Sequence, residues 1–123
     1  MGCKKQAPQI PIYKGQFVMV LTNDNKKINK KVKDFKEQSE LYGHAMNMIF
    51  DKQSSYIVVL NPKNKNNKMT VGVMAHEAVH IADFIFANCG IIHDLNNDEP
   101  LAYLVEWITD ELYEFYKEFF YGL

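Results

Sequence analysis

The sequence predicts an α+β fold in which a small antiparallel or mixed sheet of about three strands packs on two helices. Short runs of β-forming residues occupy the first half of the chain, a helix-length apolar segment follows, and a long amphipathic segment ends it. The 123 residues, 47% of them hydrophobic, match the size of one compact domain. We expect a single domain over residues 12–123, after a polar, flexible lead-in over residues 1–11 that contains Pro8 and Pro11.

The first half of the chain contains three predicted strands and one predicted helix. Residues 16–21 are rich in β-formers and end in a Thr-Asn-Asp-Asn turn, which is typical of a strand. Apolar residues recur at three to four positions among the lysines of residues 26–41, which indicates an amphipathic cover helix. Residues 44–50 and 55–60 flank a polar segment and predict a β-hairpin.

Two helices are predicted in the second half. The first runs from Thr70, a good N-cap, to Asn88, with Gly90 as a stop, and it is apolar nearly all round, so we expect it to be buried. The second begins after Asp98 and runs to about Phe120, with apolar residues at helical spacing for about five turns. One face of this last helix should therefore belong to the core.

Composition narrows the range of partners and compartments. Fourteen basic and fifteen acidic residues give a formal net charge of −1, so no nucleic-acid partner is expected. Cys3 and Cys89 lie far apart, unlike the framework of a disulfide-rich secreted domain, and the chain starts without an export or anchor signal. The longest apolar stretch, residues 71–87, contains two His, one Glu and one Asp and is not a plausible membrane span. We therefore expect a cytoplasmic protein without a membrane partner.

The segment His76-Glu77-Ala78-Val79-His80 carries the chemistry of the chain. Two histidines four residues apart project from one face of a helix, close enough to hold one metal ion, and Glu77 beside them can act as a base on a metal-bound water. The alternative is a pair of satisfied core histidines, but this pattern arises by chance in roughly 1% of shuffled chains of this composition. Buried imidazoles without partners would also be unfavourable. The motif predicts one Zn²⁺ ion held by His76 and His80, with Glu77 as general base.

Catalytic zinc usually has a third protein ligand and leaves its fourth position to water. Glu99 is the expected third ligand, because it starts the next helix nineteen residues after His80 and the intervening loop lets that helix fold back. Glu106 is seven residues further on, hence on the same helical face, and is the rival for this position.

The motif resembles that of the gluzincin metallopeptidases, in which HExxH is followed by a glutamate on a later helix, often as ExxAD or ExxSD. The second segment of the resemblance is Glu99-Pro100-Leu101-Ala102-Tyr103, and the likeness covers about a third of the chain. It implies a minimal zincin fold, with His76, His80 and Glu99 as zinc ligands and Glu77 as the base of peptide hydrolysis. It also implies a peptide or protein substrate that pairs with an edge strand, which we place at residues 55–60.

The same segments resemble small metallopeptidase-like proteins encoded by bacteriophages and their hosts. One residue departs from the gluzincin pattern, since Tyr103 stands where that family has an aspartate that supports a zinc ligand. Asp83 can take this supporting role, because it lies seven residues after His76 and three after His80 on one helical face. The alternative for Asp83 is a solvated charge near the helix end.

The remaining polar and aromatic candidates are weaker. Tyr103 is a candidate donor to a developing oxyanion, whereas most aromatic residues at this spacing serve packing. His93 is expected on the surface, with a substitute metal ligand or a donor to the transition state as the alternatives, and His44 is expected in a structural role. Three further aromatic residues of the same predicted helix offer a ring N–H or O–H: Trp107, Tyr113 and Tyr116.

The motif leaves two functions open besides peptide hydrolysis. One is a zinc-stabilised binding protein without turnover, for example a phage factor that acts on a host target. The other is hydrolysis of a non-peptide amide by the same centre. An intact glutamate at position 77 favours a hydrolase, because a structural zinc site would favour four protein ligands instead.

Overall fold

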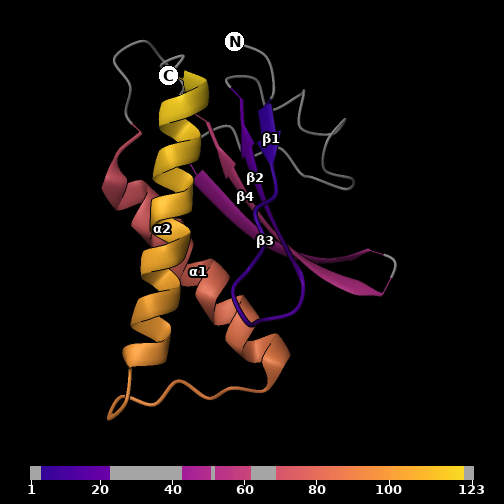
Figure 1. Ribbon diagram of the computed structural model, residues 1–123, viewed down its shortest axis with the longest axis vertical. Helices are drawn as coiled ribbons and strands as arrows, with labels where there is room; N and C mark the ends of the chain where they lie inside the picture. Colours follow the sequence, from indigo (N-terminus) through magenta and orange to yellow (C-terminus); the bar gives the residue numbers. More distant parts are fainter. Residues whose placement is uncertain (1–3, 23–42, 51, 62–68, 121–123) are drawn as a thin grey trace.

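The described residues form a four-stranded mixed sheet covered by two helices, which confirms the α+β class (Figure 1). The computed structural model describes residues 4–22, 43–50, 52–61 and 69–120. The elements in chain order are β1 (Lys4–Gln6), β2 (Gln16–Leu21), β3 (Gly43–Phe50), β4 (Gln53–Leu60), α1 (Val71–Cys89) and α2 (Glu99–Phe120). The predicted helix over residues 26–41 lies outside the described residues.

The strands lie in the order β1-β2-β4-β3. β3 and β4 form the predicted antiparallel hairpin, and Lys52 in its turn has the positive φ of 65° that tight hairpin turns require. β4 also pairs in parallel with β2, from Gln16 opposite Ser55 to Leu21 opposite Leu60. β1 pairs with β2 in the antiparallel sense.

The position of β4 corrects the prediction that residues 55–60 form the edge of the sheet. β4 has a strand on each side and is central, while β1 and β3 are the outer strands of the described sheet. The physical reason lies in the sequence of β4, whose residues from Ser55 to Leu60 are buried on both faces, as expected for a central strand with a parallel neighbour.

The N-terminal segment has more structure than the predicted flexible lead-in. Lys4–Gln6 form β1, and Ile10 is only 2% exposed in the main core. All three side chains of β1 are exposed, so the strand rests on its backbone pairing with β2. The pattern of apolar residues in the sequence therefore did not predict β1.

Both helices pack on the same face of the sheet (Figure 1). The core between these layers joins alternate residues of β2 and β4 to the apolar stripes of α1 and α2, including Phe17, Met19, Val58, Ile81 and Ile108. The other face of the sheet carries a second cluster, formed by Val18, Val20, Ile57 and Val59 with Met46 and Met48. No helix among the described residues is long and apolar enough to cross a membrane.

The ends of α1 fall where the sequence predicts them. The Thr70 hydroxyl accepts a hydrogen bond from the Val73 N–H at 3.1 Å and caps the first turn. Gly90 ends the helix in the left-handed conformation, with φ of 72°, and the Ile91 N–H donates to the Phe86 carbonyl at 2.8 Å. These caps fix which residues of α1 face the sheet.

We expect Thr70→Ala to lower the free energy of unfolding by about 1 kcal/mol, because one helical N–H loses its acceptor. Urea denaturation measures the loss. Thr70→Ser is the matched control, since it keeps the hydroxyl and should stay close to the wild-type midpoint. An alanine variant as stable as the serine variant would contradict the capping role.

Candidate metal centre

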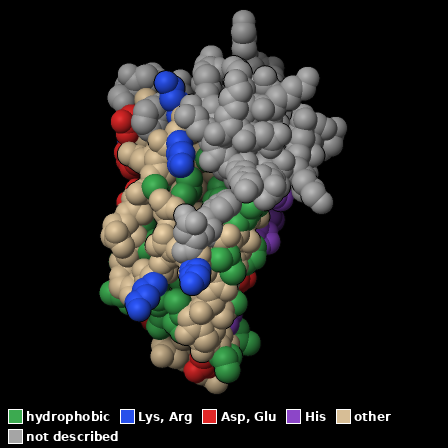
Figure 2. All heavy atoms as spheres, turned by 90° about the vertical axis from the view of Figure 1, so that its right-hand side faces the viewer, with side chains coloured by type: hydrophobic (Ala, Val, Ile, Leu, Met, Phe, Trp, Pro, Cys, Tyr) green, Lys and Arg blue, Asp and Glu red, His purple; other side chains and the backbone are tan. Residues whose placement is uncertain are grey.

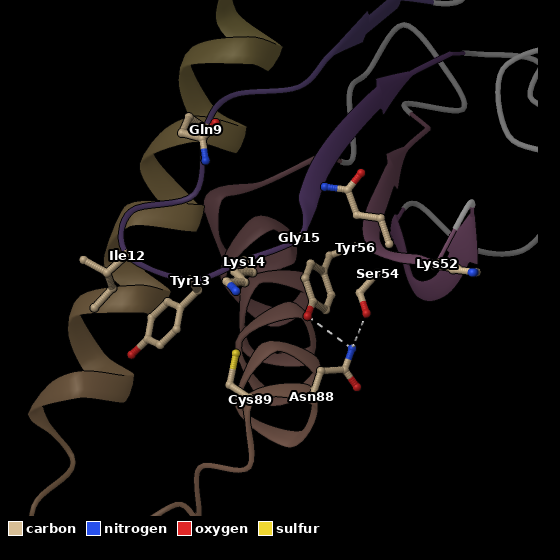
Figure 3. A pocket seen from close by; sticks show the side chains of 11 residues that line it. Gln9, Ile12, Tyr13, Lys14, Gly15, Lys52, Ser54, Tyr56, Asn88 and Cys89 are labelled. Atoms are coloured by element: carbon tan, nitrogen blue, oxygen red, sulfur yellow. Dashed lines mark hydrogen bonds between the residues drawn. The ribbon is translucent and has the colours of Figure 1, made fainter.

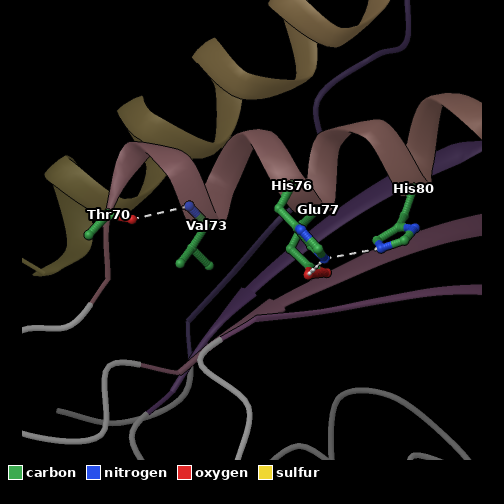
Figure 4. A network of polar contacts seen from close by, with 5 residues as sticks. All are labelled: Thr70, Val73, His76, Glu77 and His80. Carbon is green, nitrogen blue, oxygen red and sulfur yellow. Dashed lines mark hydrogen bonds and ion pairs between the residues drawn. The ribbon is translucent and has the colours of Figure 1, made fainter.

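The candidate centre lies in the first half of α1, on the side that faces the sheet (Figure 4). The residues that α1 buries follow helical spacing and are Met74, Glu77, Ala78, Ile81, Ala82, Ile85 and Phe86. Glu77 is the only charged member of this stripe. His76 and His80 flank the stripe and are exposed, with 68% of the His76 side chain accessible. The helix is therefore less buried than predicted, because its imidazoles reach solvent and only the carboxylate enters the core.

The two imidazoles are spaced as ligands of one ion. His76 Nε2 and His80 Nε2 are 3.2 Å apart, and the rings meet nearly edge-on at 76°. Zn–N bonds of about 2.0–2.1 Å in tetrahedral geometry put two ligand nitrogens about 3.3 Å apart. With a carboxylate oxygen of Glu77, the donor atoms all lie within 4.8 Å of one another. His76, Glu77 and His80 can thus hold a metal ion together.

Glu77 is a buried charged residue whose carboxylate is only partly satisfied by its described neighbours. It is 5% exposed, and its Oε2 atom is buried without a hydrogen-bond partner among the described residues. Its Oε1 atom is 3.9 Å from His76 Nε2. Burial raises the pKa of Glu77 above its ordinary value, and positive charge on His76 and His80 opposes this increase. A cation at this place would give the buried carboxylate the partner that it lacks.

Two residues of β3 belong to the same neighbourhood. A Cβ atom at Gly43 would lie 3.0 Å from Glu77 Cγ and 3.1 Å from Val73 Cγ1, so the strand packs directly on the glutamate. The next residue, His44, has its pKa lowered by burial and by positive charge on His80. Sequence reasoning placed His44 in a structural role and passed over Gly43. A glycine within a strand is the signal, since it often marks close approach of the backbone to another group.

The predicted third ligand does not join this cluster. Glu99 is exposed in the first turn of α2, at the end of the helix pair where the loop joins α2 to α1 (Figure 1). His80 lies nine residues before the end of α1 at Cys89, which corresponds to about 13 Å along the helix axis. Glu106 is also exposed on α2 and is outside the cluster. The C-terminal half of α1 therefore separates Glu99 from the histidines.

The other predicted site residues are also dispersed. Asp83 is exposed on α1, and no described hydrogen bond or ion pair joins it to His76 or His80. Tyr103 is 65% exposed on α2, and His93 is exposed in the loop before α2. Histidine side chains lie along one margin of the surface in Figure 2.

The aromatic residues of α2 serve mainly in packing. Trp107 lies against the ring of Phe17, with centroids 5.9 Å apart, and Tyr116 is buried in the main core. Tyr113 lies near the surface, where the Lys117 ammonium is 5.2 Å from its ring centroid. None of them belongs to the cluster of donor atoms around His76.

Comparison of the chain with protein-family models, with curated proteins and with solved structures found no match. The assignment of the centre therefore rests on its geometry and its donor atoms.

We expect Glu77→Gln to stabilise the metal-free protein by about 1 kcal/mol at pH 8, because it removes a buried charge that lacks a partner. The pKa of Glu77 is raised by folding, so the folded state binds the proton more tightly and the wild type loses stability as pH rises above about 4.5. Urea denaturation with a chelator at pH 4 and pH 8 measures the effect. The advantage of the variant should be small at pH 4, and an equal advantage at both values would contradict the charge penalty.

We expect Gly43→Ala to lower stability by about 1–3 kcal/mol, because the new methyl group overpacks against Glu77 and Val73. Gly72→Ala is the matched control. No described atom lies closer than 3.5 Å to its added methyl group, and alanine is favoured over glycine in a helix. Thermal unfolding of the two variants should shift in opposite directions, whereas equal shifts would contradict the close packing at Gly43.

Proposed function

We propose that the protein is a zinc-dependent hydrolase that cleaves an amide bond, with a peptide as the favoured substrate. His76 and His80 hold the ion and Glu77 is the general base. The observation that carries the proposal is the pair of imidazole nitrogens at ligand spacing beside a buried carboxylate that has an unpartnered oxygen. Two histidines with a purely structural role would not require a buried carboxylate beside them. An apolar residue at position 77 would pack more favourably in the buried stripe of α1.

The chemistry follows from the donor set. Zinc, when bound, lowers the pKa of a bound water toward about 7 and polarises a substrate carbonyl. Glu77 accepts the proton of the attacking water and passes it to the nitrogen of the leaving amine. Its raised pKa suits both steps, because a carboxylate that takes up a proton readily is an effective base near neutral pH. His76 and His80, being exposed, leave the ion accessible to a substrate.

The proposed substrate would pair with β3, the outer strand of the described sheet that lies next to the centre. β3 passes the centre at Gly43 and is an outer strand of the described sheet, so an extended peptide that pairs with β3 would run past His76 and His80. This arrangement agrees with the minimal zincin fold that the sequence resemblance implies. Main-chain pairing with β3 would hold the peptide whatever its side chains are.

We assign the third zinc position to His44 within this proposal. His44 is the imidazole of β3, it follows Gly43, which packs on Glu77, and positive charge on His80 lowers its pKa. Its side chain would have to turn toward the ion, because His44 is not part of the cluster of donor atoms. Glu99 lies in the first turn of α2, away from that cluster.

A zinc-stabilised binding protein without turnover is the second candidate. It is favoured by the composition of the cluster, in which Glu77 is the only described residue besides the two histidines that offers a ligand atom. If Glu77 ligates the ion, no base remains beside it and hydrolysis is lost. The two candidates therefore differ in the role of one carboxylate.

We expect Glu77→Gln to retain one zinc per chain and to lose at least about a thousandfold in peptide hydrolysis, because only the proton acceptor is removed. Metal analysis and mass spectrometry of a peptide mixture give the two readouts. His76→Ala and His80→Ala should lose both zinc and turnover, while the exposed Asp83→Asn is the matched control and should keep both. Loss of zinc in Glu77→Gln would favour the binding protein.

The third ligand has its own comparison. His44→Ala should weaken zinc binding by at least about tenfold. Loss of a residue that only supports a ligand already has an effect of this size, and His44 is proposed as a ligand itself. Glu99→Ala and Glu106→Ala should bind zinc as the wild type does. Weakened binding in Glu99→Ala alone would restore the ligand set predicted from the sequence.

A further inference from the structure

A second site candidate lies at the far end of α1 from the metal centre. A pocket of about 780 Å³ opens between the C-terminal end of α1, the loop before β2 and the β3–β4 turn (Figure 3). This volume is in the range of small-molecule sites. Its lining includes Ile12, Lys14, Lys52, Ser54, Tyr56 and Asn88, and none of the described residues that line it is acidic.

The floor of the pocket is an organised set of hydrogen-bond donors. The Asn88 Nδ2 atom lies 3.1 Å from the Tyr56 hydroxyl and 3.3 Å from the Ser54 hydroxyl, so both hydroxyl oxygens accept from the amide (Figure 3). Each hydroxyl then has its own hydrogen left to donate, and no other described group receives it. Tyr56 is 1% exposed and lines the pocket, so a ligand in the pocket can accept a hydrogen bond from its O–H.

The charge of the lining has the same sign throughout. Lys14 and Lys52 contribute two ammonium groups, and neither has an ion-pair partner among the described residues. Figure 2 displays one face of the molecule, on whose lower half lysine side chains lie next to hydrophobic ones. Cationic and hydroxyl donors without a competing carboxylate form an environment that selects an anion.

The rim carries a strained apolar residue. Ile12 has φ of 54° in a tight turn that the Tyr13 N–H closes on the Pro11 carbonyl at 2.6 Å, and its side chain is 91% exposed. A β-branched residue in this conformation is unfavourable and gains nothing from packing within the chain. A residue whose backbone is strained and whose side chain packs against nothing in the chain is typical of a site that contacts a ligand.

The loop itself is held against the sheet by Gly15. Its φ is 111°, and a Cβ atom there would lie 2.7 Å from Tyr56 Cε2 and 3.2 Å from the Ser54 carbonyl oxygen. Only glycine permits both this conformation and this approach. Gly15 therefore fixes the backbone of its neighbour Lys14 close to the part of β4 that carries Ser54 and Tyr56.

We propose that this pocket binds a small organic oxyanion, a carboxylate or a phosphate, attached to an apolar body. The anion is held by Lys14 and by the O–H groups of Ser54 and Tyr56, and the apolar body lies against Ile12. The pocket shares no residue with the metal centre, so it is independent of the proposed hydrolase activity.

The test is a titration of the ¹⁵N-labelled full chain, followed by NMR, with benzoate, phenyl phosphate and the neutral benzamide. We expect saturable shifts of the Gly15, Ser54 and Asn88 amides with at least one anion and none with benzamide. The anion that binds identifies the source as carboxylate or phosphate. Absence of saturable shifts with both anions, or equal shifts with benzamide, would overturn the proposal.

Two variants and a chelator complete the experiment. Lys14→Met should weaken anion binding at least tenfold, while Lys4→Met in β1, which is exposed and outside the pocket, should leave it unchanged. Carboxylates also bind zinc, so a chelator is used to exclude binding at the metal centre. Anion binding should be the same before and after chelation, because the pocket shares no residue with that centre. Unchanged affinity in Lys14→Met, or binding that chelation abolishes, would refute the pocket as the anion site.

Discussion

A carboxylate lies in the stripe of residues by which α1 packs on the sheet, and the geometry of the candidate centre depends on this placement. Because Glu77 points toward β3, its neighbours His76 and His80 necessarily project at the margin of that strand, at the spacing of two metal ligands. The strand comes this close only because Gly43 has no side chain. An apolar residue at position 77 would give a better core, so the carboxylate is a cost to folding that binding of a cation would offset.

The sequence allowed a good prediction of the elements whose signals are local. The caps at Thr70 and Gly90 and the apolar periodicity located α1, and the spacing of His76 and His80 placed two imidazoles together because four residues make about one helical turn. Strand order and the third ligand are not local properties. Parallel pairing of β4 with β2 joins residues far apart in the chain. The loop after α1 lets α2 fold back, but Glu99 starts α2 at the far end of α1, and the nine residues from His80 to Cys89 span about 13 Å.

One side of α1 carries a residue of the candidate metal centre, Glu77, near one end and a residue of the pocket, Asn88, near the other. Asn88 follows Glu77 by about three helical turns, so the two side chains project in nearly the same direction. β3 accompanies this side, with Gly43 against Glu77 and the Asn47 side-chain oxygen 3.4 Å from the Asn88 amide. One helix and one strand thus position a group suited to a cation at one end and a donor set suited to an anion at the other.

The parallel pairing of β2 with β4 has a consequence for the order of folding. The β3–β4 hairpin closes a very short loop, whereas the β2–β4 pair closes a long one and forms at a larger entropic cost. Gly43 and the histidines of α1 belong to the hairpin and to the helix that follows it, on one side of that long closure. An ion held by the histidines of α1 and by His44 of β3, the ligand set proposed above, would therefore stabilise the hairpin and the helix together. It would act on a partly folded chain as well as on the native one.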